Sequence, residues 1–418
     1  MCEITLAQSS VAIKAGRLID VESGTVMSNQ VILIEGEKIK AVGATLAVPS
    51  STEVIDLSSA TVLPGLIDAH SHLLSNTGNW TVMVTQMSTA KRALLGAANG
   101  REALQAGITT VRDLGNSGWN GDIALRDAIN SGWVMGPRIL AATRAISPVG
   151  GQFVSVTPET RNIIEQEYAQ ITGTDEARRV VRQAIFDGAD CIKIITQHGS
   201  SDQISLTLNE LRAIVEEAHA AGRKVAAHVG GRGDGNRVAR MAIEAGVDSI
   251  EHGSFLSDDD LQTMAAKKIF FVPTTASWEM YTEGGFGNSP FAAQSKFFIE
   301  QGQSRLKRAI ELGVSVAAGS DLVQPYRVHE AKGRGVVSIM RIVRSFREAG
   351  VTPMETIRSA TIRGAELLGW QDRIGSIKEG KLADLIAVQS DPLQDITVLE
   401  RVAFVAKGGV VIKNHLGR

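Results

Sequence analysis

Short apolar runs recur through the middle of the chain, separated by longer segments in which apolar residues return every three or four positions. Continuous apolar runs are typical of strands buried on both faces of a parallel sheet, whereas the longer spacing is typical of amphipathic helices. We expect helices between the runs, for example at 175–186, 209–221 and 303–312. The runs predict eight strands, near residues 61–67, 109–112, 138–142, 191–195, 225–228, 249–252, 269–273 and 315–319.

This alternation of strand and helix predicts an α/β fold, namely a (β/α)8 barrel of the TIM type over residues 63–371. Seven glycines support the prediction because each follows a helical segment, and glycine tolerates the left-handed conformation that ends many helices. An open, doubly wound parallel sheet is the alternative, but no glycine-rich phosphate loop opens the first helix. In a barrel the carboxyl ends of all strands meet at one mouth, where the active site lies.

The two ends of the chain show a different pattern, in which short strands are separated by tight turns. Such strands are expected at 11–14, 30–34 and 39–43, and again at 383–388, 402–407 and 410–412. A few isolated strands are only marginally stable in water, so neither group is expected to stand alone. We therefore predict that residues 1–62 and 372–418 meet in one small β-sandwich beside the barrel.

Composition favours small-molecule chemistry. The 418 residues include 43 Lys and Arg against 45 Asp and Glu with no run of like charge, so we expect no nucleic-acid partner and no polybasic membrane surface. No apolar window approaches membrane-spanning length, and the sequence around Met1 lacks the pattern of a leader. Two cysteines, Cys2 and Cys191, are too few for a disulfide framework. We expect a cytoplasmic protein that acts on a small molecule.

Candidate chemistry begins with His70 and His72 at the end of the first predicted strand. Because side chains alternate between the faces of a strand, the two imidazoles project from the same face. Two neighbouring imidazoles suit Zn²⁺ or, with lower selectivity, Mn²⁺, Co²⁺ or Fe²⁺. The alternative is a pair of hydrogen-bonded polar residues at a strand end, so further ligands decide the matter.

Further candidates lie at the ends of other predicted strands. His228 ends the fifth strand, His252 ends the sixth, and Asp321 follows the eighth. With His70 and His72, half of the chain's eight histidines then lie at strand ends. A barrel would bring these ends together around one mouth, which favours a shared metal centre over a chance distribution.

Lys193 lies inside the apolar fourth strand, where the burial of a charged amine is costly. Burial lowers the pKa of a lysine, and the neutral amine that results can take up carbon dioxide to form a carbamate. A carbamate is anionic and has two oxygens, so it can bridge two cations. A lysine paired with a carboxylate and a Schiff-base lysine are alternatives. Beside four strand-end histidines and Asp321, we favour the carbamate.

Two motifs make the sequence resemble the amidohydrolase superfamily over nearly its whole length. Residues 64–72 match the first-strand signature of that superfamily, and residues 375–386 look like its return into the β-sandwich. The set of candidate ligands is similar to that of the binuclear branch, in which a carboxylated lysine bridges two metal ions. The resemblance implies two divalent ions, most simply Zn²⁺, one held by His70, His72 and Asp321 and the other by His228 and His252, with Lys193 shared.

Within the superfamily, the segments 106–113, 136–139 and 246–253 resemble the group of Xaa-Pro dipeptidases, of dipeptidases and carboxypeptidases that act before Arg or Lys, and of hydrolases of aryl amides and ureas. Where that group commonly has Gly-Gly-His after the third strand, this chain has Gln152, and Val229 replaces a second histidine beside the fifth-strand ligand. Both positions lie near the expected substrate pocket, so peptide specificity does not carry over directly.

The resemblance implies hydrolysis of an amide-type C–N bond by a metal-bridging hydroxide, because two cations lower the pKa of bound water and one polarises the carbonyl. Asp321 would accept the proton of the hydroxide and deliver it to the leaving nitrogen. A dipeptide, an N-acyl amino acid or a related amide or urea is the expected substrate. Loop residues that could contact it, an arginine by binding a carboxylate, are Gln152, Arg232, Tyr281, Tyr326, Arg327 and His329.

Two other classes of function remain open. A mononuclear deaminase or cyclic-amide hydrolase of the same superfamily could use His70, His72, His228 and Asp321 as ligands, with His252 for acid–base work and a structural lysine at position 193. A non-enzymatic relative could keep the barrel as a scaffold, although it would have no need for six converging ligands. Because barrels of the resembling family are often oligomeric, we expect at least a homodimer.

Overall fold

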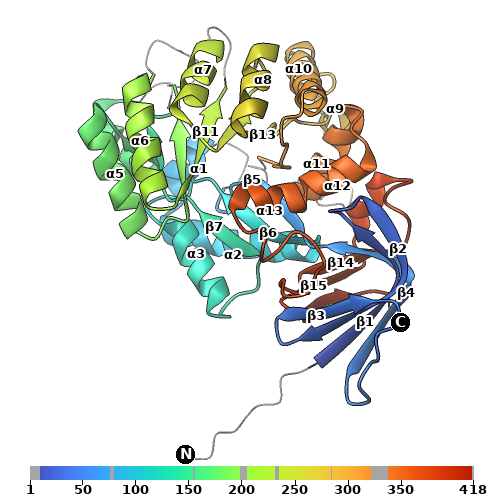
Figure 1. The fold of residues 1–418 in the computed structure, drawn as a ribbon. Helices are drawn as coiled ribbons and strands as arrows, with labels where there is room; N and C mark the ends of the chain where they lie inside the picture. Colours follow the sequence, from blue (N-terminus) through green and yellow to red (C-terminus); the bar gives the residue numbers. More distant parts are fainter. Residues whose placement is uncertain are drawn as a thin grey trace, which may run out of the picture.

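The structure is a computed structural model, and it describes residues 10–75, 80–153, 156–197, 205–230, 235–283, 285–321 and 338–416. Figure 1 shows a body of strands surrounded by helices, with a separate sheet to one side of it. The fold is thus of the mixed α/β class that the sequence predicts.

All strands of the helix-covered body are parallel, and they form two sheets. The first sheet has the order β5-β6-β7, with bounds Leu66–Ser71, Ile108–Asp113 and Arg138–Ala141. The second has the order β13-β12-β11-β10-β8-β9. Its strands, in the order of the chain, are β8 Ala145–Ser147, β9 Tyr168–Gln170, β10 Cys191–Ile195, β11 Lys224–Val229, β12 Ser249–His252 and β13 Phe270–Val272.

Backbone hydrogen bonds connect these two sheets on both sides. On one side, the amide of Asp190 donates to the carbonyl of Ala141 at 2.8 Å. On the other side, residues 315–318 lie between β13 and β5, where the Ala317 amide donates to Phe271 at 3.0 Å and the Ala69 amide donates to Ala318 at 2.8 Å. The segment predicted as the eighth strand therefore lies where a barrel requires it, although its only isolated bridge to β13 among the described residues joins Phe271 and Val316.

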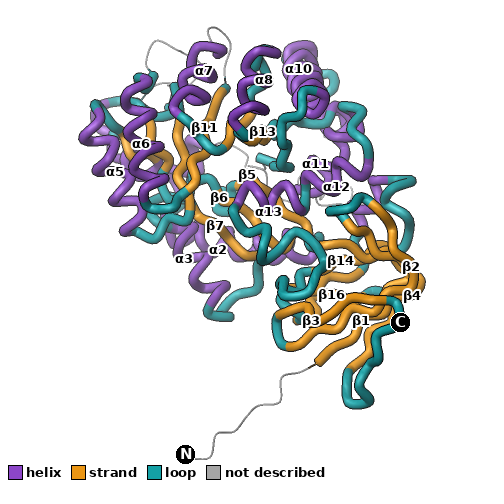
Figure 2. The backbone as a smooth tube through the Cα atoms, in the orientation of Figure 1, coloured by secondary structure: helices purple, strands orange, loops and turns teal. Residues whose placement is uncertain are grey.

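Helices lie on the outside of the parallel strands (Figures 1 and 2). Those predicted at 175–186 and 209–221 are α5 and α6, and capping boxes that pair Thr207 with Glu210 and Ser257 with Asp260 start α6 and α8. The helix predicted at 303–312 is the second half of a longer one, α10. The helices are α1 Trp80–Gln86, α2 Thr89–Gln105, α3 Gly121–Asn130, α4 Asn162–Glu167, α5 Thr174–Phe186, α6 Leu208–Ala220, α7 Gly235–Ala245, α8 Asp258–Lys267, α9 Trp278–Glu283, α10 Ala292–Glu311, α11 Ser338–Glu348, α12 Pro353–Ser359 and α13 Ile362–Leu368.

Strands from both ends of the chain join in one seven-stranded sheet of the order β16-β15-β14-β4-β1-β2-β3. The two ends meet where β14 pairs antiparallel with β4, so that Leu385 lies opposite Pro64. Both ends of the chain thus contribute strands to one sheet. A facing second sheet is not among the described strands, so the sandwich module and its bounds stay predictions. The bounds are β1 Ser10–Asp20, β2 Thr25–Glu35, β3 Lys38–Gly43, β4 Glu53–Pro64, β14 Leu385–Val388, β15 Phe404–Lys407 and β16 Val410–Asn414.

The apolar run predicted as one strand at 61–67 is divided between the two parts of the molecule. Strand β4 ends at Pro64 in the seven-stranded sheet, and β5 begins at Leu66 in the parallel sheet. Gly65 lies between them, and its amide donates to the carbonyl of Asp384 at 2.9 Å. A Cβ atom at this position would lie 2.2 Å from Oγ1 of Thr109, so only glycine fits the junction. The chain thus passes directly from one sheet into the strand that carries His70.

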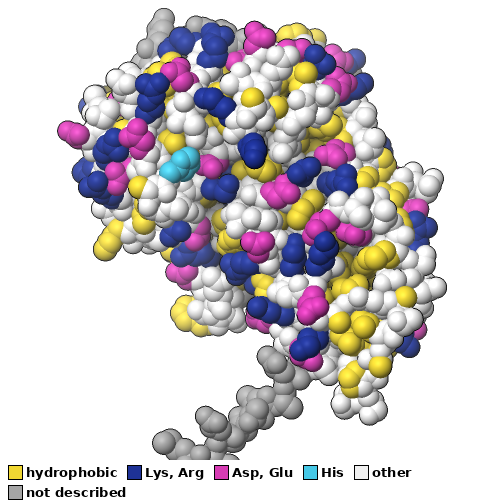
Figure 3. Space-filling model, in the orientation of Figure 1, with side chains coloured by type: hydrophobic (Ala, Val, Ile, Leu, Met, Phe, Trp, Pro, Cys, Tyr) yellow, Lys and Arg dark blue, Asp and Glu magenta, His cyan; other side chains and the backbone are white. Residues whose placement is uncertain are grey.

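One face of the molecule carries charges of both signs. Figure 3 shows basic and acidic side chains interspersed over one face of the molecule, with apolar side chains between them. None of the described helices combines the length and the apolar character needed to cross a membrane.

Candidate metal centre

Two buried histidines project from the carboxyl end of β5. The side chains of His70 and His72 are 1% and 7% exposed, and their ring centroids lie 5.3 Å apart. The Nδ1 atom of His70 bonds to the carboxylate of Glu251 at 2.7 Å, and that of His72 bonds to the carbonyl of Gly115 at 2.9 Å. A carboxylate and a carbonyl can only accept, so Nδ1 carries a proton in both rings and Nε2 is the atom that faces Asp321.

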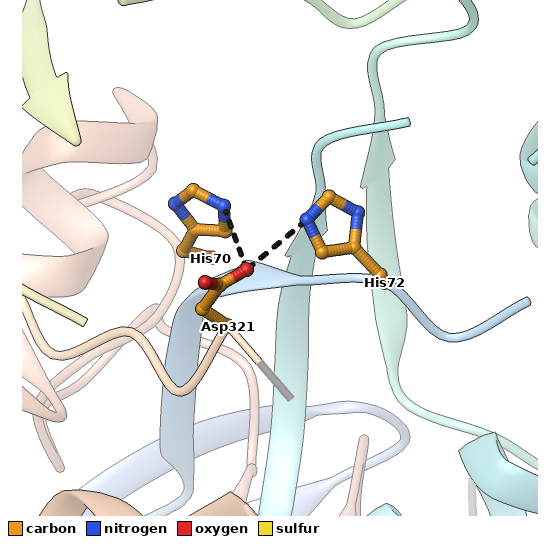
Figure 4. Close-up of side chains that lie close together, drawn as sticks. All are labelled: His70, His72 and Asp321. Carbon is orange, nitrogen blue, oxygen red and sulfur yellow. Dashed lines mark ion pairs between the residues drawn. The ribbon is translucent and has the colours of Figure 1, made fainter. Parts of the chain in front are cut away.

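Asp321 completes a three-residue site with these histidines. Its Oδ1 atom lies 3.5 Å from Nε2 of His70 and 3.3 Å from Nε2 of His72 (Figure 4). The ligand atoms of the three residues lie within 4.8 Å of one another, which is close enough for one metal ion to bind all three. This part of the predicted ligand set is brought together.

His228 and His252, at the carboxyl ends of β11 and β12, extend the cluster. Their ring centroids lie 4.3 Å apart, and the ring of His252 lies 4.9 Å from that of His70. Nδ1 of His252 is 3.7 Å from Oδ2 of Asp321, so this carboxylate lies between the two pairs of histidines. All four predicted histidines and Asp321 therefore form one contiguous group.

Most of these imidazoles are neutral, as metal ligands must be. Burial lowers the pKa of His70 and that of His252 to about 3, and burial also holds the pKa of His228 well below its ordinary value. Burial also opposes the charge on His72, but the Asp321 carboxylate outweighs it and raises the pKa of His72. A bound metal ion would replace the proton that a charged His72 carries on Nε2.

Lys193 lies in β10, and its amine is buried. The Nζ atom has no hydrogen-bond partner among the described residues. Burial lowers the pKa of Lys193 to about 8, although the carboxylates of Glu251 and Asp321 oppose that shift. A buried polar atom without a partner costs roughly 1–3 kcal/mol and so calls for an explanation. A carbamate that ligates metal ions would supply the missing interactions, so the residues present fit a metal centre with a modified lysine.

A buried network fixes the ring of His70. Glu251 accepts from His70 with one oxygen and from Arg112 Nη2 with the other at 2.8 Å, and Ser249 also donates to it. The Nε atom of Arg112 donates to the carbonyl of Ala69 at 2.6 Å, so the network returns to β5. Hydrogen bonds of this kind set the tautomer and the orientation of ligating histidines. Our sequence predictions did not include Glu251 or Arg112, although each is a charged residue inside a predicted buried strand, which was a usable signal.

Asp68 holds the turn that carries Asp321. Its Oδ1 accepts from the backbone amide of Ser320 at 2.9 Å, and its Oδ2 accepts from the Ser320 hydroxyl at 2.6 Å. The amide of Asp321 donates to the carbonyl of His70 at 2.8 Å. These bonds secure Asp321 against β5, where the two histidines lie. Asp68 too was absent from the sequence predictions.

Three residues in or next to the histidine cluster have an unusual backbone conformation. His252, Thr274 and Asp321 have φ angles of 69°, 48° and 47°, in the left-handed region that residues other than glycine seldom adopt. Each such residue costs of order 1–3 kcal/mol, and such residues cluster at functional sites. The hydroxyl of Thr274 lies 2.7 Å from Nδ1 of His252 and so helps to hold this ring.

Among the predicted substrate contacts, the structure places only Gln152 beside the cluster. Its Nε2 lies 3.4 Å from Nε2 of His228, and its Oε1 accepts from the hydroxyl of Tyr168 at 2.9 Å. Tyr281, on α9, stacks on Trp278 and lies 3.2 Å from the hydroxyl of Ser289, and its described contacts include none of the four histidines. The remaining predicted contacts lie outside the described residues: Arg232, Tyr326, Arg327 and His329.

Comparison with known proteins agrees with this geometry. Residues 61–413 match the amidohydrolase family. The chain belongs to this family. An ochratoxinase from Aspergillus niger is 29% identical over 433 aligned residues, which cover 96% of this chain and 86% of that protein. The predicted superfamily is thus confirmed, and the chain is a hydrolase that acts on carbon–nitrogen bonds.

Solved structures of similar amidohydrolases support the same conclusion. A Xaa-Pro dipeptidase with methionine bound in its active site has a TM-score of 0.84 and 33% identity, over 96% of this chain and 99% of its own. A prolidase complexed with N-methylphosphonate-L-proline has a TM-score of 0.83 and 28% identity, over 97% of this chain and 100% of its own. The overall fold and the chain length are therefore shared with amidohydrolases of the prolidase kind.

Proposed function

We propose that the protein is a metal-dependent amidohydrolase that cleaves an amide-type C–N bond in a small substrate such as a dipeptide or an N-acyl amino acid. The observation that carries the proposal is the convergence of four histidines and Asp321 beside the amine of Lys193, which has no hydrogen-bond partner among the described residues. The names of the similar proteins agree with this chemistry, since they include an ochratoxinase, a Xaa-Pro dipeptidase and a prolidase.

We further propose that the parallel strands form a closed (β/α)8 barrel and that two divalent ions, most simply Zn²⁺, bind at its mouth. His70, His72 and Asp321 would hold one ion, His228 and His252 the other, and Lys193 would serve both as a carbamate. Bound there, the ions would supply water of lowered pKa and would polarise the carbonyl of the substrate.

Asp321 is the residue that would move the proton. Its side chain is 25% exposed, and it lies between both histidine pairs, so it is accessible from the mouth. Burial opposes its ionisation, yet the hydrogen bond from His72 holds the pKa of Asp321 well below its ordinary value. The carboxylate is therefore ionised, and in that form it can accept a proton from the attacking water and give it to the leaving nitrogen.

The test combines metal analysis with a panel of dipeptides, N-acyl amino acids and aryl amides. We expect about two metal ions per chain and hydrolysis of at least one amide. Lys193→Ala should lose bound metal and turnover by several orders of magnitude, and small carboxylic acids should partly restore both. Lys407→Ala is a matched control. Lys407 is half-buried in β15 of the seven-stranded sheet, and its amine donates to the carbonyl of Gly136. Full activity in Lys193→Ala would refute the carbamate.

A mononuclear deaminase or cyclic-amide hydrolase is the second candidate. Within the described residues, only His70, His72 and Asp321 place their ligand atoms close enough together for one ion. One metal ion per chain, together with release of ammonia or opening of a cyclic amide, would favour this candidate over the binuclear enzyme.

A further inference from the structure

Arg341 lies on α11, beside the candidate metal centre. Its Nη2 atom donates to the carbonyl of Thr274 at 3.1 Å, and the hydroxyl of the same threonine holds Nδ1 of His252. The carboxylates of Asp321 and Asp68 are nearby negative charges, although neither forms an ion pair with Arg341 among the contacts of the described residues. Thr274 therefore links the guanidinium group of Arg341 to His252, a proposed metal ligand.

Unlike its neighbours on the helix, Arg341 has no ion-pair partner among the described residues. Its Nε atom is buried and makes no hydrogen bond with any of them. One turn further along α11, Arg344 pairs with Glu400 at 2.8 Å and with Glu283 at 2.7 Å, and Arg347 pairs with Glu279. An arginine keeps its charge even when buried, and a largely buried charge without a partner destabilises the fold. A substrate anion would supply the ion-pair partner that the described residues do not provide.

We propose that Arg341 binds a carboxylate of the substrate. This inference rests on the proposed function and narrows it to amides that carry a free carboxylate near the scissile bond, such as dipeptides and N-acyl amino acids, in preference to neutral aryl amides and ureas. A guanidinium group keeps its charge and binds carboxylates strongly through charge-assisted hydrogen bonds. Arg232 and Arg327, which the sequence suggested for this role, lie outside the described residues.

The test compares a hydrolysed N-acyl amino acid with its carboxamide, which lacks the negative charge. In Arg341→Met, we expect the ratio of kcat/KM for the acid to that for the carboxamide to fall by about 30-fold or more. Arg347→Met is the matched control on the same helix and should keep the wild-type ratio. Arg341→Lys retains the charge without the guanidinium group and should lie between the two; it also serves if the methionine variant fails to fold.

Two results would overturn the inference. If kcat/KM falls equally for the acid and for the carboxamide in Arg341→Met, the arginine acts only through its hydrogen bond to Thr274. If the wild-type enzyme hydrolyses neutral amides but none of the acids, the inference fails while the proposed amidohydrolase function stands. Hydrolysis of no amide at all would instead contradict the proposed function itself.

A separate observation is a cavity of about 210 Å³ beside His252. Its apolar lining comes from Val229, Phe255, Leu256 and Phe298. Gly253 also lines it. A Cβ there would lie 2.7 Å from Leu256 and 2.9 Å from Phe271, so a larger residue would displace these side chains. Gly230 also lines the cavity, and a Cβ there would lie 2.9 Å from Nε2 of His228. The cavity thus borders His252 directly, and one residue of its lining lies next to His228.

The geometry points to a subsite for an apolar side group of the substrate, up to the size of a phenyl ring, since an apolar cavity of about 150 Å³ suffices to bind benzene. Phe298→Trp would fill the cavity, whereas Phe297→Trp, at a neighbouring residue that is 47% exposed, is the matched control. We expect Phe298→Trp to lower about tenfold the preference, measured as a ratio of kcat/KM values, for a phenylalanyl over a glycyl substrate. An unchanged preference would exclude this subsite.

Discussion

At the scale of single residues, the ring of His70 depends on a charge that lies behind it. Glu251 accepts from His70 and from Arg112, and all three side chains are almost completely buried. Burial opposes the charge on Glu251, but Arg112 and the bond from His70 hold the pKa of that carboxyl far below its ordinary value. Glu251 therefore stays ionised and keeps the lone pair of His70 on Nε2, toward Asp321.

We predict that Glu251→Gln weakens metal binding by about 10- to 100-fold, because partners of ligating histidines typically contribute that much to affinity. Competition with a chromophoric chelator measures the change. Glu244→Gln removes an exposed carboxylate that pairs with Arg212 and should leave the affinity unaltered. Metal affinity at the wild-type level in Glu251→Gln would show that the hydrogen bond to His70 does not orient the ligand.

Whether such residues can be predicted from sequence depends on how local their signal is. The four histidines and Asp321 were predictable because each lies where an apolar run ends, and that position is visible in the chain itself. Glu251 meets Arg112 across an interval of 139 positions, and Asp68 meets Ser320 across 252. Those partnerships depend on which strands become neighbours. Arg341 lies on an amphipathic helix, where an arginine carries no signal of its own.

At the scale of elements, the alternation of apolar runs and amphipathic segments predicted most of the parallel strands and the helices around them. The glycines at 107, 132, 188, 222, 246, 313 and 350 all have positive φ, as their predicted role as helix ends requires. Two elements were misjudged. The run at 61–67 is uniformly apolar because it is buried in both sheets, so hydrophobicity alone could not reveal the break at Gly65. Phe291, which caps α10, and Phe297, in its first half, are both exposed, which obscured the helical period.

We predict that Gly65→Ala destabilises the protein by about 1–3 kcal/mol, the usual cost of forcing extra atoms into a packed site. The added Cβ would meet the side chain of Thr109 on β6, so the junction between β4 and β5 would have to move away from β6. Urea unfolding measures the loss. Gly100→Ala, within α2, is the matched control. A Cβ at Gly100 would lie 3.4 Å from Pro137, which is an ordinary van der Waals contact. Equal stability of the two variants would contradict the tight junction.

At the scale of the whole molecule, the centre draws on both parallel sheets. His70 and His72 come from the sheet of β5, whereas Lys193, His228 and His252 come from the other, and Asp321 follows the segment that lies between them. A ligand held by all of them therefore binds the native arrangement and not the unfolded chain.

We predict that chelation of the bound metal lowers the Tm by about 3 °C or more, since a ligand at 100 times its Kd adds about 2.7 kcal/mol to stability. Differential scanning calorimetry with and without a chelator measures the shift, and added Zn²⁺ should reverse it. In His72→Ala the chelator should have a much smaller effect. A Tm that does not respond to chelation in the wild-type protein would argue against a metal centre that ties the sheets together.

The pairing of β14 with β4 has a consequence for the synthesis of the protein. Residues 61–64 of β4 emerge from the ribosome early, yet their partners at 385–388 are translated more than 300 residues later. Until then an apolar strand edge stays uncovered next to the segment that carries His70. A nascent chain that stalls before β14 should therefore be a client for chaperones, and loss of the last strands should reduce the yield of folded enzyme even though they contribute no ligand.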